Sequence, residues 1–221
     1  LELAHTIFDG SNEKGNDYSL IYINYKTEAP ETKVINCTFI DNNQHIEFKL
    51  SNSESSSGSV LFSKCNFSKN CDSKDGQFSL LNLDYIQCDS FRVEECKFEQ
   101  NGGQCISVNE KRSNIHIYKC TFSNNIGYDG CAIFVETASK DYKMIVEDCT
   151  FDGNKPKYAS SFNTGAVVTY SNGIQFAGKN TFINNEVHAV QPDTTDESAK
   201  TIGGSLFIIQ MDPEEYTISN L

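Results

Sequence analysis

The sequence has few basic residues, no tryptophan and no long apolar run. Lysine and arginine together number 18, against 30 aspartates and glutamates, so the net charge is −12. Nucleic-acid binding needs a basic face to neutralise phosphates, and this balance argues against it. No apolar run is long enough for a membrane-spanning helix. No stretch shows a sustained helical period either, so we expect little α-structure.

What the sequence does contain is a repeated Cys-x-Phe-x-x-Asn motif. Five copies are complete, a sixth has asparagine in place of cysteine at Asn180, and a degenerate first copy surrounds Phe8. Successive phenylalanines lie 24 to 31 residues apart, which is typical of stacked coils joined by loops of variable length. We therefore interpret residues 1–221 as a single repeat domain, and as a fragment of a longer protein. The motif residues are Cys37, Cys65, Cys96, Cys120 and Cys149; Phe39, Phe67, Phe98, Phe122, Phe151 and Phe182; and Asn42, Asn70, Asn101, Asn125, Asn154 and Asn185.

The residues before each cysteine predict a strand with one buried face. Apolar and β-forming residues alternate there, as at Met144 and Val146 before Cys149. Cysteine and phenylalanine, two apart, share the buried face of a second short strand, and a corner lies just before the cysteine. Glycine followed by apolar residues begins a third strand, as at Gly165. Three parallel strands per coil predict an all-β fold, a right-handed parallel β-helix of about seven coils.

The motif residues are expected to form structural ladders through the stack. Nine cysteines cannot all pair internally, and we expect the motif cysteines to be reduced thiols that act as small apolar residues. The asparagines should adopt the left-handed conformation at the second corner and bond amide to amide; a polar binding row is the alternative. The residue before the cysteine position alternates in charge, which either favours one register or arises by chance. These residues are Lys64, Glu95, Lys119, Asp148 and Lys179.

Phe-x-x-Asn together with glycine-led apolar strands resembles the repeats of the polymorphic outer-membrane protein family. The phenylalanine–asparagine element matches in six copies; the glycine element matches loosely, best at Gly165-Ala166-Val167 and Gly203-Gly204-Ser205-Leu206. The composition and the repeated cysteine look more like a trichomonad-type protist member than a chlamydial one. The resemblance implies a right-handed β-helical ectodomain, exposed at a cell surface or secreted, with an adhesive role. The expected partners are a host-cell protein or glycan, or neighbouring copies of the chain.

No pattern of catalytic residues emerges, and we expect no enzyme, no cofactor and no metal. Parallel β-helices also occur in pectate lyases and polygalacturonases, so a carbohydrate-active protein is the competing hypothesis. Arg92 and His116 should stand side by side on neighbouring coils, either gripping an anion or simply solvated. Asp72 with Asp75, and the acidic group 193–197, either hold calcium or are solvated turns.

A binding surface is expected on the strands that follow glycine. Inward residues there should be Ile106, Val108, Ile133, Val135, Val167, Leu206 and Ile208. The opposite parity is polar at Ser107 and Asn109 but apolar in the last coils, at Phe134, Val168, Tyr170, Phe207 and Ile209. Such a stripe needs a cover, either the insert Glu186–Ile202 or a partner. Two triplets, beginning at Asn36 and Asn66, are possible glycosylation sites.

Overall fold

The computed structural model describes the chain in thirteen stretches. They are residues 1–10, 21–25, 31–42, 46–50, 58–70, 79–83, 88–108, 113–127, 130–136, 143–156, 163–169, 174–186 and 202–208. All regular structure in these stretches is β-strand. The expectation of an all-β chain is therefore confirmed for the described part.

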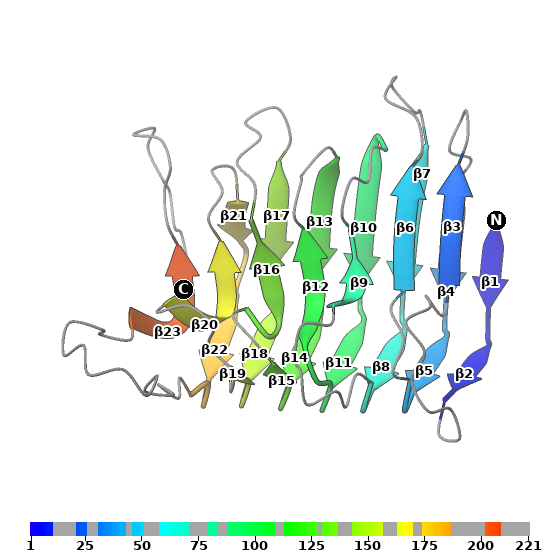
Figure 1. The fold of residues 1–221 in the computed structure, drawn as a ribbon. Coiled ribbons are helices and arrows are strands. Elements are labelled where there is room, and N and C mark those ends of the chain that lie inside the picture. Colours follow the sequence, from blue (N-terminus) through cyan, green and yellow to red (C-terminus); the bar gives the residue numbers. More distant parts are fainter. Residues whose placement is uncertain are drawn as a thin grey trace, which may run out of the picture.

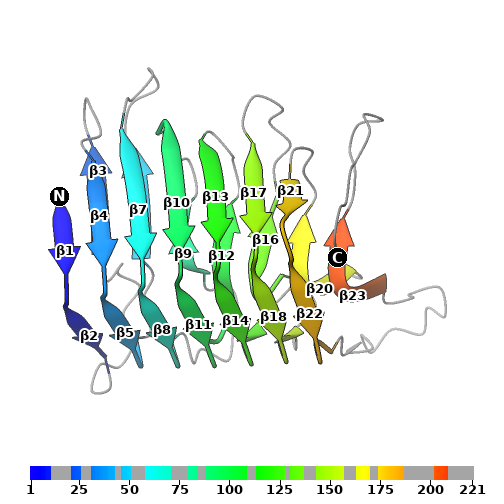
Figure 2. The same cartoon turned by 180° about the vertical axis from the view of Figure 1, so that it is seen from behind.

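The strands form three seven-stranded parallel sheets and one small sheet (Figures 1 and 2). Sheet 1 holds β1 (Glu2–Ala4), β4 (Thr32–Ile35), β7 (Ser59–Ser63), β10 (Ser90–Glu94), β13 (Asn114–Tyr118), β17 (Met144–Glu147) and β21 (Ile174–Ala177). Sheet 2 holds β2 (Ile7–Asp9), β5 (Thr38–Ile40), β8 (Asn66–Ser68), β11 (Lys97–Glu99), β14 (Thr121–Ser123), β18 (Thr150–Asp152) and β22 (Thr181–Ile183). Sheet 3 holds β3 (Ile21–Tyr25), β6 (Ile46–Leu50), β9 (Ser79–Asn82), β12 (Gln104–Val108), β16 (Ile133–Val135), β20 (Asn163–Thr169) and β23 (Ile202–Ile208). The small sheet pairs β15 (Ile126–Gly127) with β19 (Lys155–Pro156). Because the chain visits sheets 1, 2 and 3 in turn, the fold is a parallel β-helix.

The register places like residues of successive coils directly above one another. Seven phenylalanines, from Phe8 to Phe182, pair in one row of sheet 2. Their rings stack nearly parallel with centroids 4.6 to 5.0 Å apart. The spacing equals the distance of about 4.8 Å between neighbouring strands, so the backbone ladder itself sets the ring stack. This phenylalanine column lies at the centre of the core.

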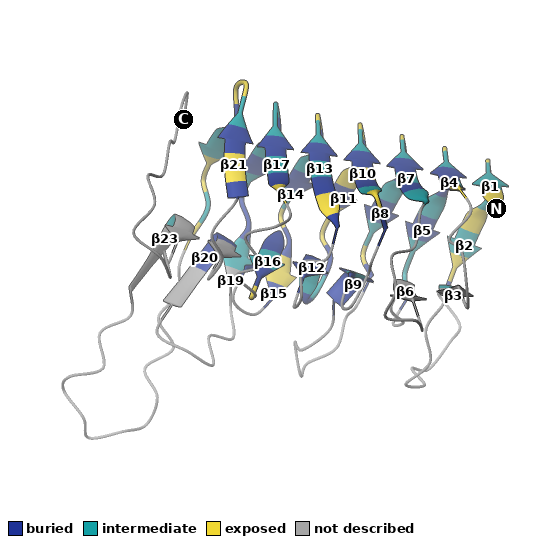
Figure 3. Ribbon diagram, turned by 90° about the horizontal axis from the view of Figure 1, so that it is seen from above, coloured by how far each residue is buried: buried dark blue, intermediate teal, exposed yellow. Residues whose placement is uncertain are grey.

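Burial alternates along the strands of sheets 1 and 2, as the period-two pattern predicts (Figure 3). In β10, for example, Phe91 and Val93 are fully buried while Arg92 is exposed. The motif cysteines and the phenylalanines from Phe39 to Phe151 belong to one continuous hydrophobic core. Phe8 and Phe182, at the two ends of the described column, are only partly buried against that core. The inward positions inferred from the sequence are thus confirmed in these sheets.

Sheet 3 confirms the inward parity but corrects one outward residue. Ile106, Val108, Ile133, Val135 and Val167 are buried, as predicted. Ser107, predicted to face solvent, is only 3% exposed. It lies in register between Asn82 and Phe134. Cys105, which has the same parity on β12, is also buried, so parity alone does not set exposure on this strand. Asn109 and the side chains of Leu206 and Ile208 lie outside the described residues.

Except in the coil of Asn180, where Gly178 lies two residues ahead, each described coil turns from sheet 1 to sheet 2 through one left-handed residue. That residue directly precedes the cysteine position, with φ between 51° and 56° at Asn36, Lys64, Glu95, Lys119 and Asp148. A second left-handed residue directly precedes the motif asparagine, at Asp41, Lys69, Gln100, Asn124, Gly153 and Asn184. The prediction that the motif asparagine itself takes this conformation is wrong. The neighbour makes the turn and leaves the asparagine side chain directed into the protein.

The motif asparagines form a hydrogen-bonded ladder along the second corner. Asn125 is typical: its Oδ1 accepts bonds from the backbone N–H and the Nδ2 of Asn101, both at 3.0 Å. Its own Nδ2 donates to the carbonyl of Phe98 at 3.0 Å and to Oδ1 of Asn154 at 2.8 Å. The same pattern links Asn42, Asn70, Asn101, Asn125, Asn154 and Asn185. The ladder supplies partners for backbone groups that the corner removes from the sheets.

The motif cysteines form a second ladder, which the sequence did not predict. The Cys120 thiol donates to the carbonyls of Tyr118 in its own coil and Val93 in the preceding coil, both at 3.4 Å. The backbone N–H of Cys120 in turn donates to Sγ of Cys149 at 3.4 Å. These thiols therefore donate and accept hydrogen bonds, in addition to packing as the small apolar residues we expected. All eight cysteines in the described part of the chain are free of disulfides.

The last described coil carries asparagine in the cysteine column and has a longer corner. Asn180 Oδ1 accepts from the backbone N–H of Cys149 at 3.0 Å, and its Nδ2 donates to Val146 and Ala177 carbonyls. Between Ala177 and Thr181 the chain has one residue more than the preceding coil has between Glu147 and Thr150. The longer carboxamide replaces the thiol where the corner is wider.

Candidate functional site

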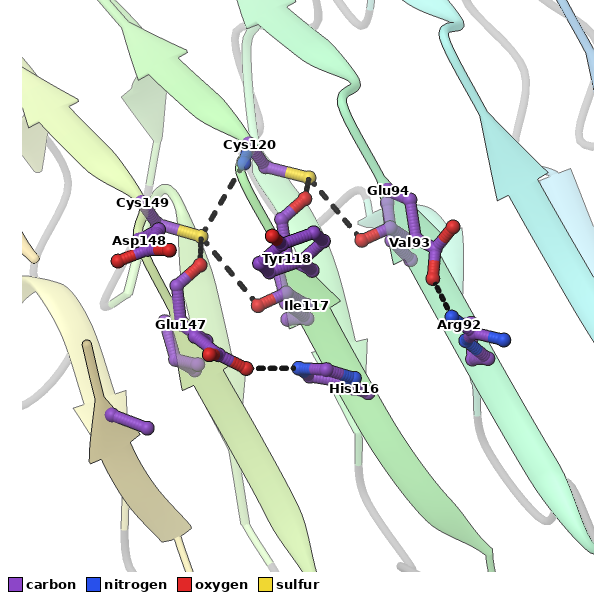
Figure 4. Close-up of polar contacts among 12 residues, drawn as sticks. Arg92, Val93, Glu94, His116, Ile117, Tyr118, Cys120, Glu147, Asp148 and Cys149 are labelled. Carbon is purple, nitrogen blue, oxygen red and sulfur yellow. Dashed lines mark hydrogen bonds and ion pairs between the residues drawn. The ribbon is translucent and has the colours of Figure 1, made fainter. Parts of the chain in front are cut away.

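A group of polar and aromatic side chains lies on the outer face of sheet 1, over β10, β13 and β17 (Figure 4). We call Arg92, Glu94, His116, Tyr118 and Glu147 the outer cluster. Arg92 pairs in register with His116, and Glu94 with Tyr118; Tyr118 pairs with Glu147 on the next strand. Because these residues alternate with buried ones such as Val93 and Ile117, their side chains share the outward face.

Both basic members of the outer cluster are paired with carboxylates. The Arg92 guanidinium forms an ion pair with Glu94, two residues along the same strand. His116 Nε2 lies 2.9 Å from Glu147 Oε2 on the neighbouring strand. The sequence correctly placed Arg92 beside His116. Both side chains contact glutamates of the same cluster, however, which weakens the hypothesis that the two bind an anion together.

Tyr118 contributes the aromatic surface of the cluster. Its ring centroid is 5.6 Å from that of His116, at a tilted angle. The ammonium of Lys119 lies 4.7 Å from the Tyr118 ring centroid. A hydrogen bond with Tyr118 raises the pKa of Lys119, and Asp148 and Glu95 add to the shift. The cluster therefore combines an aromatic ring, hydrogen-bond donors and two carboxylates on a flat sheet.

This arrangement can bind a polar ligand, and its members are only partly exposed. The side chains of His116 and Glu147 are 31% and 34% exposed, and Glu94 is 19% exposed. Partial burial orders these groups before any ligand arrives, which lowers the entropy lost on binding. Acid–base catalysis would further require a group placed within hydrogen-bond reach of a reacting atom, and a bound substrate would have to define that atom.

The sequence-derived binding stripe lies mostly outside the described residues. Phe134 is half-buried, and its backbone pairs with Val168, which pairs with Phe207, so the predicted row exists in the register. The side chains of Val168 and Phe207, and the whole of Tyr170 and Ile209, are outside the described part. The same holds for the insert between Glu186 and Ile202. The stripe and its cover stay a prediction.

The corner column between sheets 1 and 2 carries opposite charges in neighbouring coils. Lys64 Nζ lies 4.0 Å from Glu95 Oε2, with both side chains more than half exposed. The backbone N–H of Lys179 donates to Oδ1 of Asp148 at 2.8 Å. Exposed pairs of this kind contribute below about 1 kcal/mol each. They are consistent with the register-favouring interpretation and do not form a binding site.

Burial disfavours a reactive thiolate at Cys88, Cys120 and Cys131. Burial raises the pKa of the Cys131 thiol to about 12, and it also raises the pKa of Cys88. Burial likewise raises the pKa of Cys120 well above its ordinary value. A thiol kept protonated is a poor nucleophile and a poor metal ligand. Among the described residues no group of three His, Cys, Asp or Glu side chains converges on a metal position. Asp72, Asp75 and the acidic group 193–197 lie outside them.

The two glycosylation triplets occupy different environments. Asn36 is exposed at a left-handed corner, with φ 51°. Asn66 is half-buried within β8, in register with Thr38 and Lys97. The two triplets are indistinguishable in the sequence, which does not reveal that only Asn36 lies on a corner.

Three members of the outer cluster were not predicted from the sequence. Glu94, Tyr118 and Glu147 each lie two residues before a motif cysteine. That spacing puts them on the same outward row, next to the row of Arg92 and His116. The polar residues two and four positions before each motif cysteine, compared across coils, indicate this cluster.

The stacked coils define the chain as a parallel β-solenoid, and a comparison with known families supports this. The family of right-handed β-helix regions matches residues 2–143 and, in a second match, residues 85–201. The chain belongs to this right-handed β-helix family. No curated protein and no solved structure matches the chain. Across the described ranges there is no helix long and apolar enough to cross a membrane.

Proposed function

We propose that the chain is a non-catalytic β-helical segment of about seven coils in a cell-surface or secreted protein, acting in adhesion or as a structural spacer. The observation that carries the proposal is the uninterrupted stack. The phenylalanine column and the asparagine ladder continue in register from coil to coil. Such a stack is rigid along its axis and presents repeated outer rows, which suits a spacer or an adhesive surface.

The resemblance to polymorphic outer-membrane protein repeats supports the same proposal. Members of that family are surface-exposed, and the phenylalanine–asparagine element that carries the resemblance is the element that builds the core of this protein. The proposed partners are a host-cell protein or glycan, or neighbouring copies of the chain. A protist origin would fit the repeated cysteine, and this part of the proposal rests on composition alone.

The outer cluster favours a second candidate, a carbohydrate-active β-helix. An imidazole paired with a carboxylate at 2.9 Å, next to a tyrosine ring, is suited to contacts with sugar hydroxyls. Under this alternative, the cluster would bind or cleave a polysaccharide that lies along the axis of the helix.

One assay separates the two candidates. The protein is incubated with a glycan array and with soluble oligosaccharides, including oligogalacturonides, and the products are analysed by mass spectrometry. The first proposal predicts no cleavage, with or without binding. Cleavage that is lost in Glu147→Gln and kept in Lys33→Gln, a residue on the same face four coils from Glu147 and two coils from Arg92, would overturn it. Surface labelling of intact source cells with an antibody against the chain tests the proposed location.

A further inference from the structure

The two Asn-x-Ser/Thr triplets lie in neighbouring coils and allow a direct comparison of positions. Asn36-Cys37-Thr38 spans the corner between sheets 1 and 2, whereas Asn66-Phe67-Ser68 is the whole of strand β8. An N-linked oligosaccharide needs a side-chain amide that is free and directed into solvent, with space for the first sugar. The structure can therefore distinguish two sites that the sequence cannot.

The Asn36 position satisfies these conditions. Its left-handed backbone turns the residue outward, and its column contains the exposed residues His5, Lys64, Glu95 and Lys119. The column therefore already accommodates long side chains directed into solvent. Within the described part of the chain, Asn36 uses only its backbone N–H, which donates to Ser63 at 3.0 Å, and its carboxamide has no partner.

The Asn66 position is less favourable. Its carboxamide also has no partner within the described part, but the residue is half-buried at the first position of strand β8. Thr38 and Lys97 lie on the two neighbouring strands at the same height, each about 4.8 Å away. A sugar ring is wider than that spacing, and half-buried Thr38 on the face of sheet 2 has less room to move aside than the exposed corner residues His5 and Lys64 beside Asn36.

We propose that Asn36 carries an N-linked oligosaccharide and that Asn66 does not. In the transfer, Nδ2 of Asn36 loses a proton and bonds to the anomeric carbon of a lipid-diphosphate-linked oligosaccharide. The bond from that carbon to the lipid diphosphate breaks, and the proton leaves with the lipid diphosphate. The proposal rests on the proposed secretion of the chain. The glycan would project from the corner and leave the outer cluster uncovered.

The repeat offers matched variants that test position rather than local sequence. Lys119→Asn creates an Asn-Cys-Thr triplet with Cys120 and Thr121, at the corner equivalent to that of Asn36. Thr121→Asn creates an Asn-Phe-Ser triplet with Phe122 and Ser123, at the strand position equivalent to that of Asn66. Both lie in one coil, and each is made in a chain that also carries Asn36→Gln and Asn66→Gln.

Each chain is directed into the secretory pathway of eukaryotic cells by a cleavable leader. The secreted protein is analysed by mass spectrometry before and after removal of N-glycans in heavy-oxygen water. Transfer occurs on the emerging chain, but only chains that fold around the glycan are secreted, so occupancy in the secreted fraction reports the fit. Thr38→Ala should abolish occupancy at Asn36, and Thr38→Ser should retain it.

We expect Asn36 and the Lys119→Asn site to be occupied, with at least tenfold lower occupancy at Asn66 and at the Thr121→Asn site. A secreted chain without a glycan at Asn36 would overturn the proposal. Equal occupancy at corner and strand sites would also overturn it, because position would then select nothing. Since the leader supplies secretion, neither result bears on the location of the native protein, which the surface-labelling experiment tests separately.

Discussion

The two corner columns that flank the phenylalanine column use different side chains to make the same pattern of hydrogen bonds. In the asparagine ladder, Asn125 bonds to the Phe98 carbonyl, which lies three residues before Asn101 of the preceding coil. In the cysteine ladder, Cys120 bonds to the Val93 carbonyl, three residues before Cys96 of the preceding coil. In each column, backbone N–H groups are accepted by the equivalent side chain of the following coil.

The two columns differ in the strength of their hydrogen bonds and in the residue types that they accept. A carboxamide has a separate donor and acceptor, whereas a thiol is weak in both roles. The carboxamides also bond to one another along the column, at 2.8 to 3.1 Å. The cysteine column accepts other side chains: Asn180 replaces the thiol in one coil, and Thr6 in another, where its hydroxyl donates to Ala4 at 3.0 Å. We infer that the asparagine column contributes more to register than the cysteine column.

The largest loss of stability is expected in the phenylalanine column, which lies between the asparagine and cysteine ladders. Phe122→Ala should lower the free energy of unfolding by about 3–5 kcal/mol, because it leaves a cavity between Phe98 and Phe151. Denaturant unfolding measures this change. Thr121→Ala, the outward neighbour, is the control and should change stability by less than about 0.5 kcal/mol. A loss below about 1 kcal/mol for Phe122→Ala would reject the inward register.

Removing one carboxamide should break the stronger ladder. Asn125→Ala leaves the backbone N–H of Asn101 and the carbonyl of Phe98 buried without their side-chain partner. Each such group costs about 1–3 kcal/mol, so we expect a total of about 2–4 kcal/mol. Asn66→Ala is the matched control, since the Asn66 carboxamide has no partner in the described part of the chain. Equal losses in both variants would contradict the ladder.

Alkaline pH should reduce the stability contributed by the buried thiols and leave the contribution of the carboxamides unchanged. Burial raises the pKa of Cys131 to about 12, so the folded state holds the thiol proton more tightly than the unfolded chain, whose cysteines titrate at about 8.5. This contribution is complete below that pH and is lost as pH rises toward 12, by about 1.4 kcal/mol per pH unit for each such thiol. The free energy of unfolding, measured from denaturant curves at several pH values, should fall less steeply with pH in Cys131→Ala than in the unchanged protein. An unchanged slope would show that this thiol is accessible in the folded state.

The smallest change is expected in the cysteine ladder. Cys120→Ala should cost about 1 kcal/mol, clearly less than Asn125→Ala, because the thiol hydrogen bonds are weak and long. Cys120→Ser restores a donor at the same position and tests whether hydrogen bonding or packing accounts for the loss. If Cys120→Ala costs as much as Asn125→Ala, the two columns contribute equally and the inferred difference is wrong.

Much of this fold could be predicted because the repeat exposes equivalent positions. Aligning the motif copies identified the strands, the buried rows, and the corner before each cysteine. The left-handed residue at the second corner could not be assigned from the sequence, since asparagine tolerates that conformation and the residue before it varies from Lys69 and Gln100 to Gly153. The motif cysteines were also expected to act as apolar residues, although a thiol beside a corner can donate to nearby backbone carbonyls.

The candidate site was less predictable, because it depends on contacts between rows. Arg92 and His116 were placed correctly side by side, but their partners Glu94 and Glu147 come from a second row and from different coils. The burial of Ser107 and Cys105, which both have the outward parity of β12, also departs from the simple alternation of residues. Contacts of this kind can be assigned only once the strand register and the side-chain positions are both known.

Hydrogen exchange of the asparagine carboxamides tests the central claim most directly. If the motif asparagines form a buried ladder, the side-chain NH₂ protons of Asn70, Asn101 and Asn125 should exchange only as the protein unfolds. Those of Asn36 and Asn66, which have no partner in the described part of the chain, should exchange at the rate of a free amide. NMR spectra recorded after transfer into heavy water separate the two groups. Equally fast exchange at all five residues would contradict the ladder and the register on which it depends.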